Sequence, residues 1–364
     1  MKVICVVGAR PNIMKIAPIM EAINIHNQSS DRHIRHLLVH TGQHYDEKMS
    51  KLFFNDLKIP EPDINLEVGS SSQAVQTAEI MKSFEVVCLR EKATHVLVVG
   101  DVNSTLACAL VASKLNIKVI HVEAGLRSYD RSMPEEINRV LTDAISDILF
   151  TTEGSAEENL RREGISLDKI FFVGNVMVDT LIKHKEMSQR SDILNVLRLQ
   201  AKEFALVTLH RPANVDNPET LGEILNALSE ISTKIPLLFP VHPRTITSIE
   251  KSCFRINENI VMCEPLGYLE FLNVMSNSKF VLTDSGGIQE ETTVLGIPCL
   301  TIRGNTERPV TVSEGTNILV GTKKEGIIQE GERILRGIVR KSKIPELWDG
   351  KAAMRIVETL ALSV

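Results

Sequence analysis

Short, unbroken apolar runs separated by longer amphipathic segments recur along this 364-residue chain and restrict it to few folds. In the first half of the chain such runs predict strands at residues 3–8, 36–40, 95–100, 118–122 and 147–152. They do not alternate between apolar and polar residues, as expected of strands that are covered on both faces. The intervening segments predict helices at residues 14–26, 73–91, 104–115, 134–146 and 155–163. This βα repeat is typical of a parallel, doubly wound sheet.

The same pattern starts again in the second half of the chain. Strands are predicted at 204–209, 236–241, 259–265, 279–284 and 298–302, with helices near 219–232, 268–276 and 288–295. We therefore predict an α/β protein with two Rossmann-like domains, residues 1–172 and 173–350, that face each other across a cleft, where open α/β sheets usually bind ligands. A last helix is expected over about 327–362, interrupted by "IPELWDG", and residues 351–364 are expected to pack back on the first domain.

Composition and charge exclude several classes of protein. The net charge is −5 with basic residues spread along the chain, which gives no argument for binding nucleic acid or an anionic membrane. No apolar stretch approaches 18 residues, and "MKVICVVGARP" is too short for a signal peptide. The six cysteines show neither a CxxC spacing nor a Cys/His cluster, so we expect no disulfide framework and no metal site. A reducing compartment, the cytoplasm, is the predicted location.

Two carboxylates stand where predicted strands end. Asp101 follows the run at 95–100, and Glu123 follows the run at 118–122. If these strands are neighbours in a parallel sheet, both acids lie at the same edge of it. They are then either solvated loop residues or a pair that handles protons.

The first turn, "GARPNIMK", lacks the GxGxxG fingerprint of dinucleotide-binding folds, which disfavours NAD. It supplies instead Arg10 and Lys15, two cations near a helix N-terminus, which suits an anion. The alternative is a solvated loop arginine and a surface lysine.

The segment "LTDSGGIQEE" (282–291) resembles an anion site. A strand ends at Asp284, Ser285 can cap a helix, and Gly286 and Gly287 expose backbone N–H groups in its first turn. Such a turn forms a nest for phosphate or pyrophosphate. Glu291, further along the helix, could accept ribose hydroxyls. An ordinary N-cap with glycines for tight packing is the alternative.

Two further segments carry candidate residues. In "SMPEEINR" (132–139), Glu135 and Arg139 have the spacing of an i,i+4 ion pair, a common surface feature, just beyond the loop that follows Glu123. In "TLHRPANVDN", His210 stands at a strand end of the second domain, directed into the same cleft. Beside a phosphate nest it becomes a candidate proton donor or phosphate ligand.

A series of segments resembles, in family order, the motifs of the non-hydrolysing UDP-N-acetylglucosamine 2-epimerases. They are "GARPNIMKIAP", "HTGQHYD", "GDVNSTLA", "HVEAGLRS", "MPEEINR", "TLHRPANVD", "PLGYLEF", "LTDSGGIQEE" and "TERPVTVSEGTN", within about the first 320 residues. The resemblance implies a glycosyltransferase type B fold, a homodimer, and no metal or NAD. It also implies reversible conversion of UDP-GlcNAc to UDP-ManNAc, through elimination of UDP to 2-acetamidoglucal and its re-addition, for the synthesis of surface polysaccharide.

The resemblance also implies roles for residues at matching positions. The acid/base carboxylates would be Asp101, Glu123 and Glu135, with Arg139 orienting them or screening their repulsion and His210 serving the UDP leaving group. Diphosphate and ribose would be held by Arg10, Lys15, Ser285, Gly286, Gly287 and Glu291, with Phe271 beside the uracil.

The chain also departs from the family's pattern. Many relatives have Glu in place of Asn12, and bacterial members that are activated by UDP-GlcNAc carry an Arg-Gln pair near residues 66–80, where this chain has no Arg. A remnant of the activator site would be Gln43, Glu136, Arg211 and His242. We therefore predict that activation by a second substrate molecule is weak or absent.

Four other functions remain open from the sequence. A hydrolysing 2-epimerase is disfavoured, because its relatives begin with a turn closer to "GSRAEYG". The other three are an epimerase of a related sugar nucleotide (such as a 6-deoxy UDP-sugar), a glycosyltransferase of the same fold, and a protein that senses a sugar nucleotide without turning it over.

Overall fold

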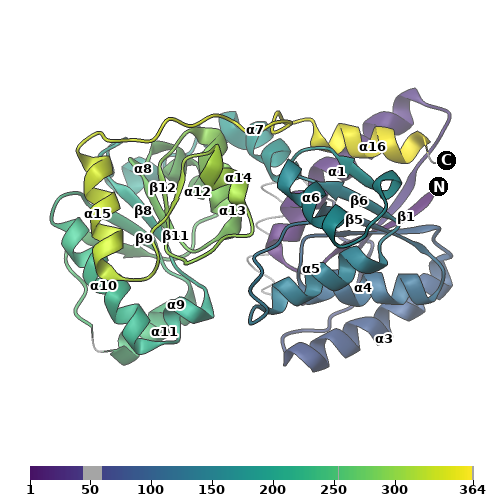
Figure 1. Cartoon of the computed structure of the whole chain (residues 1–364), viewed down its shortest axis with the longest axis horizontal. Helices are drawn as coiled ribbons and strands as arrows, with labels where there is room; N and C mark the ends of the chain where they lie inside the picture. Colours follow the sequence, from purple (N-terminus) through teal and green to yellow (C-terminus); the bar gives the residue numbers. More distant parts are fainter. Residues whose placement is uncertain (44–59, 253, 363–364) are drawn as a thin grey trace. The chain divides into compact units, whose positions relative to one another are not determined.

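The computed structural model describes residues 1–43, 60–252 and 254–362, and it divides the chain into two compact α/β units (Figure 1). Unit 1 comprises Met1–Lys183 and Glu346–Val364, and unit 2 comprises His184–Pro345. The predicted fold class, two doubly wound parallel-sheet domains, is confirmed.

The predicted domain boundaries, 172/173 and 350/351, differ from those of the structure. The first boundary falls eleven residues later, inside helix α7 (Val176–Ser188). The start of α7 is attached to unit 1, because Thr180 Oγ1 donates to the Met14 carbonyl (2.6 Å) and Lys183 forms an ion pair with Glu21 (2.6 Å).

In the part of unit 1 that the structure describes, seven parallel strands form a sheet in the order β3-β2-β1-β4-β5-β6-β7. They are β1 (Lys2–Val7), β2 (Arg35–His40), β3 (Ile64–Asn65), β4 (His95–Val99), β5 (Lys118–Ala124), β6 (Ile148–Thr151) and β7 (Ile170–Phe172). Strands β3 and β7 were not predicted, because two or three residues are too few to produce a periodic pattern.

Helices cover both faces of this sheet. Figure 1 shows α3, α4 and α5 side by side below it in this view, and α1 and α16 above it. The helices of unit 1 besides α7 are α1 (Arg10–Ser29), α3 (Gln73–Glu91), α4 (Asn103–Lys114), α5 (Pro134–Ile145), α6 (Gly154–Arg162), the 3₁₀ turn Leu167–Lys169 and α16 (Ala352–Leu362). The bounds of α3 match the prediction, because local signals end it: Ser72 accepts a hydrogen bond from Val75 N, and Lys92 is left-handed.

Within the described residues of unit 2, six parallel strands form a sheet in the order β10-β9-β8-β11-β12-β13. They are β8 (Ala205–Thr208), β9 (Leu237–Pro240), β10 (Ile260–Cys263), β11 (Val281–Thr283), β12 (Cys299–Thr301) and β13 (Asn317–Leu319). The helices are α8 (Ile193–Val196), α9 (Pro212–Val215), α10 (Pro218–Ser232), α11 (Pro243–Ser252), α12 (Tyr268–Asn277), α13 (Gly286–Leu295), α14 (Pro309–Ser313) and α15 (Lys324–Leu335).

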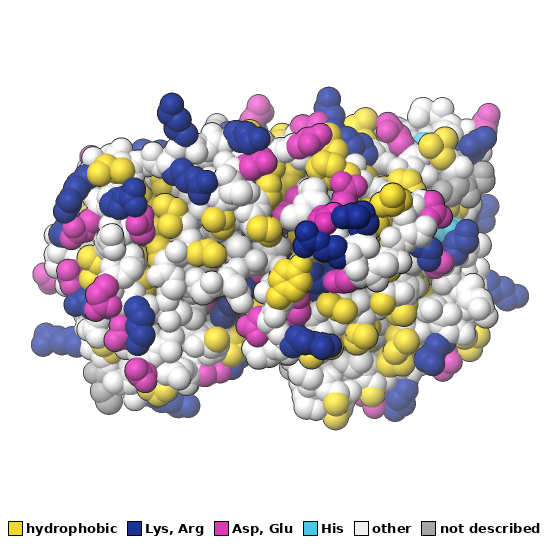
Figure 2. Space-filling model, in the orientation of Figure 1, with side chains coloured by type: hydrophobic (Ala, Val, Ile, Leu, Met, Phe, Trp, Pro, Cys, Tyr) yellow, Lys and Arg dark blue, Asp and Glu magenta, His cyan; other side chains and the backbone are white. Residues whose placement is uncertain are grey.

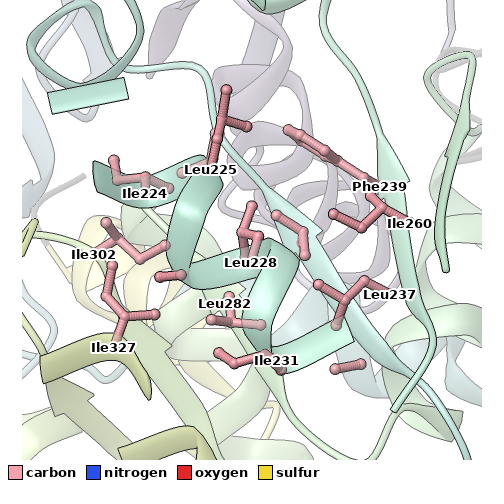
Figure 3. Packing of buried hydrophobic residues seen from close by; sticks show 14 of the residues in the cluster. Ile224, Leu225, Leu228, Ile231, Leu237, Phe239, Ile260, Leu282, Ile302 and Ile327 are labelled. Atoms are coloured by element: carbon pink, nitrogen blue, oxygen red, sulfur yellow. The ribbon is translucent and has the colours of Figure 1, made fainter. Parts of the chain in front are cut away.

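The core of unit 2 lies between α10 and its sheet. Ile224, Leu228 and Ile231 share one face of α10 and are buried against strand residues such as Leu237 and Leu282 (Figure 3). Burying a side chain of this size contributes about 1.5–3 kcal/mol. This packing fixes the strand ends that carry the polar residues described below.

The C-terminal helix predicted over about 327–362 is interrupted around "IPELWDG", as expected, although the break begins earlier than that segment. Helix α15 ends at Leu335, and α16 begins at Ala352 and belongs to unit 1, where it packs against α1. In the segment between them, Trp348 is buried and its indole N–H donates to the Thr152 carbonyl (2.9 Å). The carboxylate of Asp179 accepts from the N–H groups of Ala352 (3.1 Å) and Ala353 (2.7 Å), and so caps α16.

Charged side chains of both signs are interspersed over the face shown in Figure 2. No helix among the described residues combines the length and the apolar character needed to cross a membrane.

Asp179 makes the docking of α16 dependent on pH. Burial raises its pKa to about 6, above the value of about 3.9 for an unfolded chain. Protonated Asp179 is thus favoured by folding, and this stabilisation is complete below about pH 4 and is lost as pH rises through 6. The unfolding free energy of wild type relative to Asp179→Asn should fall by on the order of 2 kcal/mol between pH 4 and 7 in urea titrations. A difference between the two unfolding free energies that stays constant over this pH range would contradict the prediction.

Candidate active site

Asp101 and Glu123 lie at the same edge of the sheet of unit 1. Strands β4 and β5 are parallel neighbours, Glu123 is near the end of β5, and Asp101 follows β4 by two residues. Each carboxylate is paired with a separate cation, Glu123 with Lys15 and Asp101 with Arg139. The edge therefore carries two ion pairs.

Glu123 is held in an unusual backbone conformation. The register of β5 shifts between Val122 and Ala124, and Glu123 between them has φ +73°. A left-handed conformation costs a residue with a side chain about 1–2 kcal/mol, and such strain concentrates at functional sites. The side chain is 5% exposed, so the bulge directs a carboxylate into a protein environment rather than into water.

Lys15 is buried beside Glu123, whereas the sequence suggested a cation for an anionic ligand or a surface lysine. Gly100 makes room for the pair: its φ is +69°, and a Cβ there would lie 3.0 Å from Lys15 Nζ and 3.9 Å from Glu123 Oε2. Asn12 stabilises the turn between β1 and α1. Its Oδ1 accepts from Ala9 N (3.0 Å), and its Nδ2 donates to the Val99 carbonyl (2.9 Å).

Helix α5 supplies Arg139. The predicted Glu135–Arg139 pair is not found among the described residues; Arg139 pairs instead with Glu136, three residues before it, and with Asp101. Glu136 is buried and accepts from the N–H groups of Ser128 (2.9 Å) and Tyr129 (2.8 Å). It thereby anchors the loop after Glu123. Glu135 is exposed at the start of the helix.

Two other predicted residues of unit 1 lie near these strand ends. Gln43 is buried, and its Oε1 accepts from the N–H (3.0 Å) and the hydroxyl (2.6 Å) of Ser104, in the first turn of α4. Arg10 is the first residue of α1, and its side chain lies outside the described part of the structure.

In unit 2, Asp284 connects the ends of two neighbouring parallel strands, β8 and β11. Its carboxylate is fully buried and accepts from the N–H groups of His210 (3.1 Å) and Arg211 (2.9 Å) and from the Asn214 amide (3.1 Å). Burial opposes ionisation, but the bonds to His210 and Arg211 outweigh it and lower the pKa of Asp284 below its ordinary value.

Asp284 also orients the imidazole of His210. Oδ1 lies 2.9 Å from His210 Nδ1, which places a proton on that nitrogen, while half of the side chain is exposed. Sequence analysis identified His210 but not Asp284 as a site residue. The sequence feature that could have identified Asp284 is its position at the end of predicted strand 279–284, which lies beside the strand that ends at His210.

Helix α13 begins at Gly286, where the nest was predicted. Ser285 is the N-cap residue, as predicted, but its hydroxyl makes no capping hydrogen bond within the described structure. Gly286 is required sterically, because a Cβ there would lie 2.6 Å from both the Arg308 guanidinium and the Glu307 carboxylate.

Three arginines surround buried Glu307 beside this helix start. Arg308 (2.6 Å), Arg303 (2.8 Å) and Arg211 (3.6 Å) all reach its carboxylate. Burial would raise the pKa of Glu307, but these charges hold it far below its ordinary range. Arg308 also pairs with Glu290 (2.7 Å). The arginines and the first turn of α13 together suit an anionic ligand.

Glu291 is buried on α13 and accepts a hydrogen bond from the hydroxyl of Tyr268 (3.1 Å). Burial raises its pKa to about 8, so that its carboxyl group carries a proton for much of the time at neutral pH. Phe271, half-buried, lies on α12 one turn after the Gly267 cap. His242 is exposed, and its Nδ1 accepts from Arg244 N (3.2 Å) at the start of α11.

Among the described residues there is no group of three or more His, Cys, Asp or Glu side chains arranged to hold a metal ion.

Residues 26–361 match the family model described as UDP-N-acetylglucosamine 2-epimerase. The chain belongs to this family. The UDP-N-acetylglucosamine 2-epimerase of Methanocaldococcus jannaschii is 45% identical over 99% of both chains. The crystal structure of the M. jannaschii UDP-GlcNAc 2-epimerase in complex with UDP-GlcNAc and UDP matches with a TM-score of 0.90, 43% identity and complete coverage of both chains.

Two further relatives of this 2-epimerase family are named for different sugars. The UDP-2,3-diacetamido-2,3-dideoxy-D-glucuronate 2-epimerase of Pseudomonas aeruginosa is 40% identical over 99% of both chains. The UDP-N-acetylglucosamine 2-epimerase of Escherichia coli K12 is 34% identical over 99% of this chain and 98% of its own. Overall sequence identity to these relatives therefore does not decide between UDP-N-acetylglucosamine and UDP-2,3-diacetamido-2,3-dideoxy-D-glucuronate as the substrate.

Asp284→Ala should remove the acceptor of three buried donors and destabilise unit 2 by about 2–4 kcal/mol. Urea unfolding followed by circular dichroism measures this loss. The matched control is Asp216→Ala, which breaks an exposed pair with Arg244 and should cost less than about 1 kcal/mol. Equal losses for the two variants would show that Asp284 does not brace the turn.

Proposed function

We propose that the protein interconverts UDP-N-acetylglucosamine and UDP-N-acetylmannosamine by epimerisation at C2. The observation that carries the proposal is the pair of carboxylate–cation contacts, Glu123–Lys15 and Asp101–Arg139, at one sheet edge in a member of this 2-epimerase family. The solved relative that contains UDP-GlcNAc and UDP supports the choice of substrate. Family membership makes the chain an isomerase.

The proposed chemistry has two balanced steps. In the first, the C2–H bond breaks and its proton passes to a carboxylate, while the C1–O bond breaks and its electrons leave with UDP. A C1=C2 double bond forms, giving 2-acetamidoglucal. In the second step a proton returns to the opposite face of C2 and UDP adds back to C1. Because the proton leaves one face of C2 and returns to the other, the reaction needs acid/base groups on both sides of C2.

Asp101 and Glu123 are suited to these two positions. They lie at the ends of adjacent strands, and each forms an ion pair with a separate cation. Glu123 is nearly excluded from water, whereas the Asp101 side chain is 29% exposed. Exclusion of water protects the unsaturated intermediate from side reactions. Glu135 is proposed as a third carboxylate, at the exposed start of α5.

Unit 2 is proposed to hold the nucleotide. His210, oriented by Asp284, is positioned to serve the departing UDP oxygen. The first turn of α13, at Ser285, Gly286 and Gly287, binds diphosphate through backbone N–H groups, which stabilises the charge that develops when UDP leaves. The remaining proposed ligands are Glu291 for the ribose, Phe271 for the uracil and Arg10 for the diphosphate. Lys15, buried in its pair with Glu123, is not proposed as a diphosphate ligand.

We also infer that the protein acts as a homodimer in the cytoplasm, as the family resemblance implies. Light scattering of the purified protein measures the oligomeric state, and a monomer at micromolar concentration would contradict the inference.

A second candidate substrate is UDP-2,3-diacetamido-2,3-dideoxy-D-glucuronate, which is favoured by the 40% identity to the Pseudomonas enzyme of that name. Incubation with each UDP-sugar, followed by proton NMR, separates the candidates. Formation of UDP-ManNAc from UDP-GlcNAc supports the proposal. Free ManNAc with UDP means hydrolysis, and turnover of the diacetamido sugar alone transfers the proposal to that substrate.

Asp101→Asn and Glu123→Gln should each lower kcat by at least about 1,000-fold, because each removes a proton-transferring group that the intact site positions. UDP affinity, measured by calorimetry, should remain close to that of wild type, because the proposed nucleotide ligands are mostly in unit 2. Near-normal turnover in both variants would contradict a catalytic role for these acids.

Activation by a second UDP-GlcNAc molecule should be weak or absent. The described residues of 66–80 contain no arginine, and Gln43 and Glu136 are both engaged in hydrogen bonds within unit 1. Initial rates from UDP-ManNAc should therefore be measurable without added UDP-GlcNAc, and the rate should depend hyperbolically on UDP-GlcNAc. A sigmoidal dependence, or a need for UDP-GlcNAc in the reverse reaction, would contradict this.

A further inference from the structure

Next to the strand ends that carry Asp101 and Glu123 lies a buried network of charged side chains that the proposed mechanism does not use. His121 lies on β5, Asp143 on α5, and Arg127 in the loop after β5. The side chains of His121 and Asp143 are fully buried, and that of Arg127 is 1% exposed. The network extends to Glu163, which pairs with Arg127 (2.6 Å).

The hydrogen bonds of His121 determine its protonation. Nε2 lies 2.8 Å from the carbonyl oxygen of Gly100, and Nδ1 lies 2.6 Å from Asp143 Oδ1. A carbonyl oxygen and a carboxylate can only accept, so both ring nitrogens must carry a hydrogen. His121 is then an imidazolium.

Asp143 is ionised in this arrangement. Its second oxygen accepts from Gly125 N (3.0 Å) and from the Arg127 guanidinium (2.7 Å), and both donors favour the ionised carboxylate. Burial raises the pKa of Asp143, but the charges and hydrogen bonds of His121 and Arg127 outweigh it and hold the pKa below its ordinary value. His121, Asp143, Arg127 and Glu163 together carry no net charge, which makes burial of the group tolerable.

This network forms hydrogen bonds to the two turns that carry Asp101 and Glu123. His121 holds the Gly100 carbonyl, immediately before Asp101, and Asp143 holds the Gly125 N–H, two residues after Glu123. Gly100, Glu123 and Gly125 all have positive φ, at 69°, 73° and 80°. Glycine adopts a positive φ readily, so only Glu123 is in a disfavoured conformation, and the hydrogen bonds of the buried pair to Gly100 and Gly125 hold the backbone near it.

We propose that imidazolium His121 and Asp143 are positioning residues that fix the turns of Asp101 and Glu123 for C2 proton transfer. The proposal deepens the proposed 2-epimerase function and rests on it. Neither residue touches the substrate, so both act on the chemical step through the placement of the carboxylates. Misplacing a catalytic group by about 1 Å costs on the order of 100-fold in rate.

The charge state is tested in the full-length wild-type protein without any substrate. Two-dimensional NMR of protein labelled with ¹⁵N-histidine, at pH 7.5, should show one buried imidazole with both nitrogens protonated, and His121→Gln should remove that signal. Asp143→Asn should convert it to the neutral pattern, because an amide can donate to Nδ1. A neutral pattern for His121 in wild type would overturn the proposal.

The positioning role is tested by steady-state kinetics with UDP-GlcNAc. Both variants should lose about 10- to 100-fold in kcat while KM, and the Kd for UDP from calorimetry, change by less than roughly threefold. The matched control is His95→Gln, a buried histidine at the opposite end of β4 that bonds Thr94, which should keep wild-type kcat. Melting curves verify that each variant is folded at the assay temperature.

Three outcomes would overturn the positioning role. Unchanged kcat in Asp143→Asn and His121→Gln contradicts it directly, as does an equal loss in His95→Gln. Wild-type protein that binds UDP and shows the imidazolium signal but converts no UDP-sugar would refute the proposed function, and the positioning role with it.

Discussion

The ion pair between Lys15 and Glu123, buried at the end of β5, is the interaction on which the arrangement of unit 1 depends. A buried pair of this kind costs several kcal/mol in desolvation, and removing one partner leaves an uncompensated charge at a cost of about 3–5 kcal/mol. Gly100 leaves space for the lysine, and Asn12 fixes the turn at the start of its helix. These features hold the Glu123 carboxylate in a nearly dry environment with its charge balanced by Lys15.

The two units use an Asp–His pair in different ways. In unit 2, Asp284 is buried and His210 is half-exposed, so the imidazole is oriented from behind and its other nitrogen is available to a ligand. In unit 1, Asp143 and His121 are both fully buried, and the second ring nitrogen is occupied by a backbone carbonyl. In unit 2 the aspartate orients a half-exposed imidazole, and in unit 1 the pair bonds the backbone before Asp101 and after Glu123.

Much of the fold followed from periodicity, because the longer strands are continuous apolar runs and α3 has clear end signals. The site was predicted less completely. Asp101, Glu123 and His210 were identified because acidic and basic residues at strand ends are visible in the sequence. The burial of Lys15 and the choice of Glu136 over Glu135 as partner of Arg139 depend on helix packing and rotation, which spacing alone does not determine. Asp143 and Glu307 sit in the middle of helical or loop sequence and show their roles only when distant segments meet.

In the proposed reaction a carboxylate of unit 1 removes the C2 proton, and a solvent-exchangeable proton replaces it. Proton NMR and mass spectrometry of the sugar nucleotides formed from UDP-GlcNAc in D₂O test this exchange. We expect essentially every molecule of UDP-ManNAc to carry deuterium at C2. UDP-ManNAc formed with its original C2 proton would contradict proton transfer through these carboxylates and would require a different route to inversion.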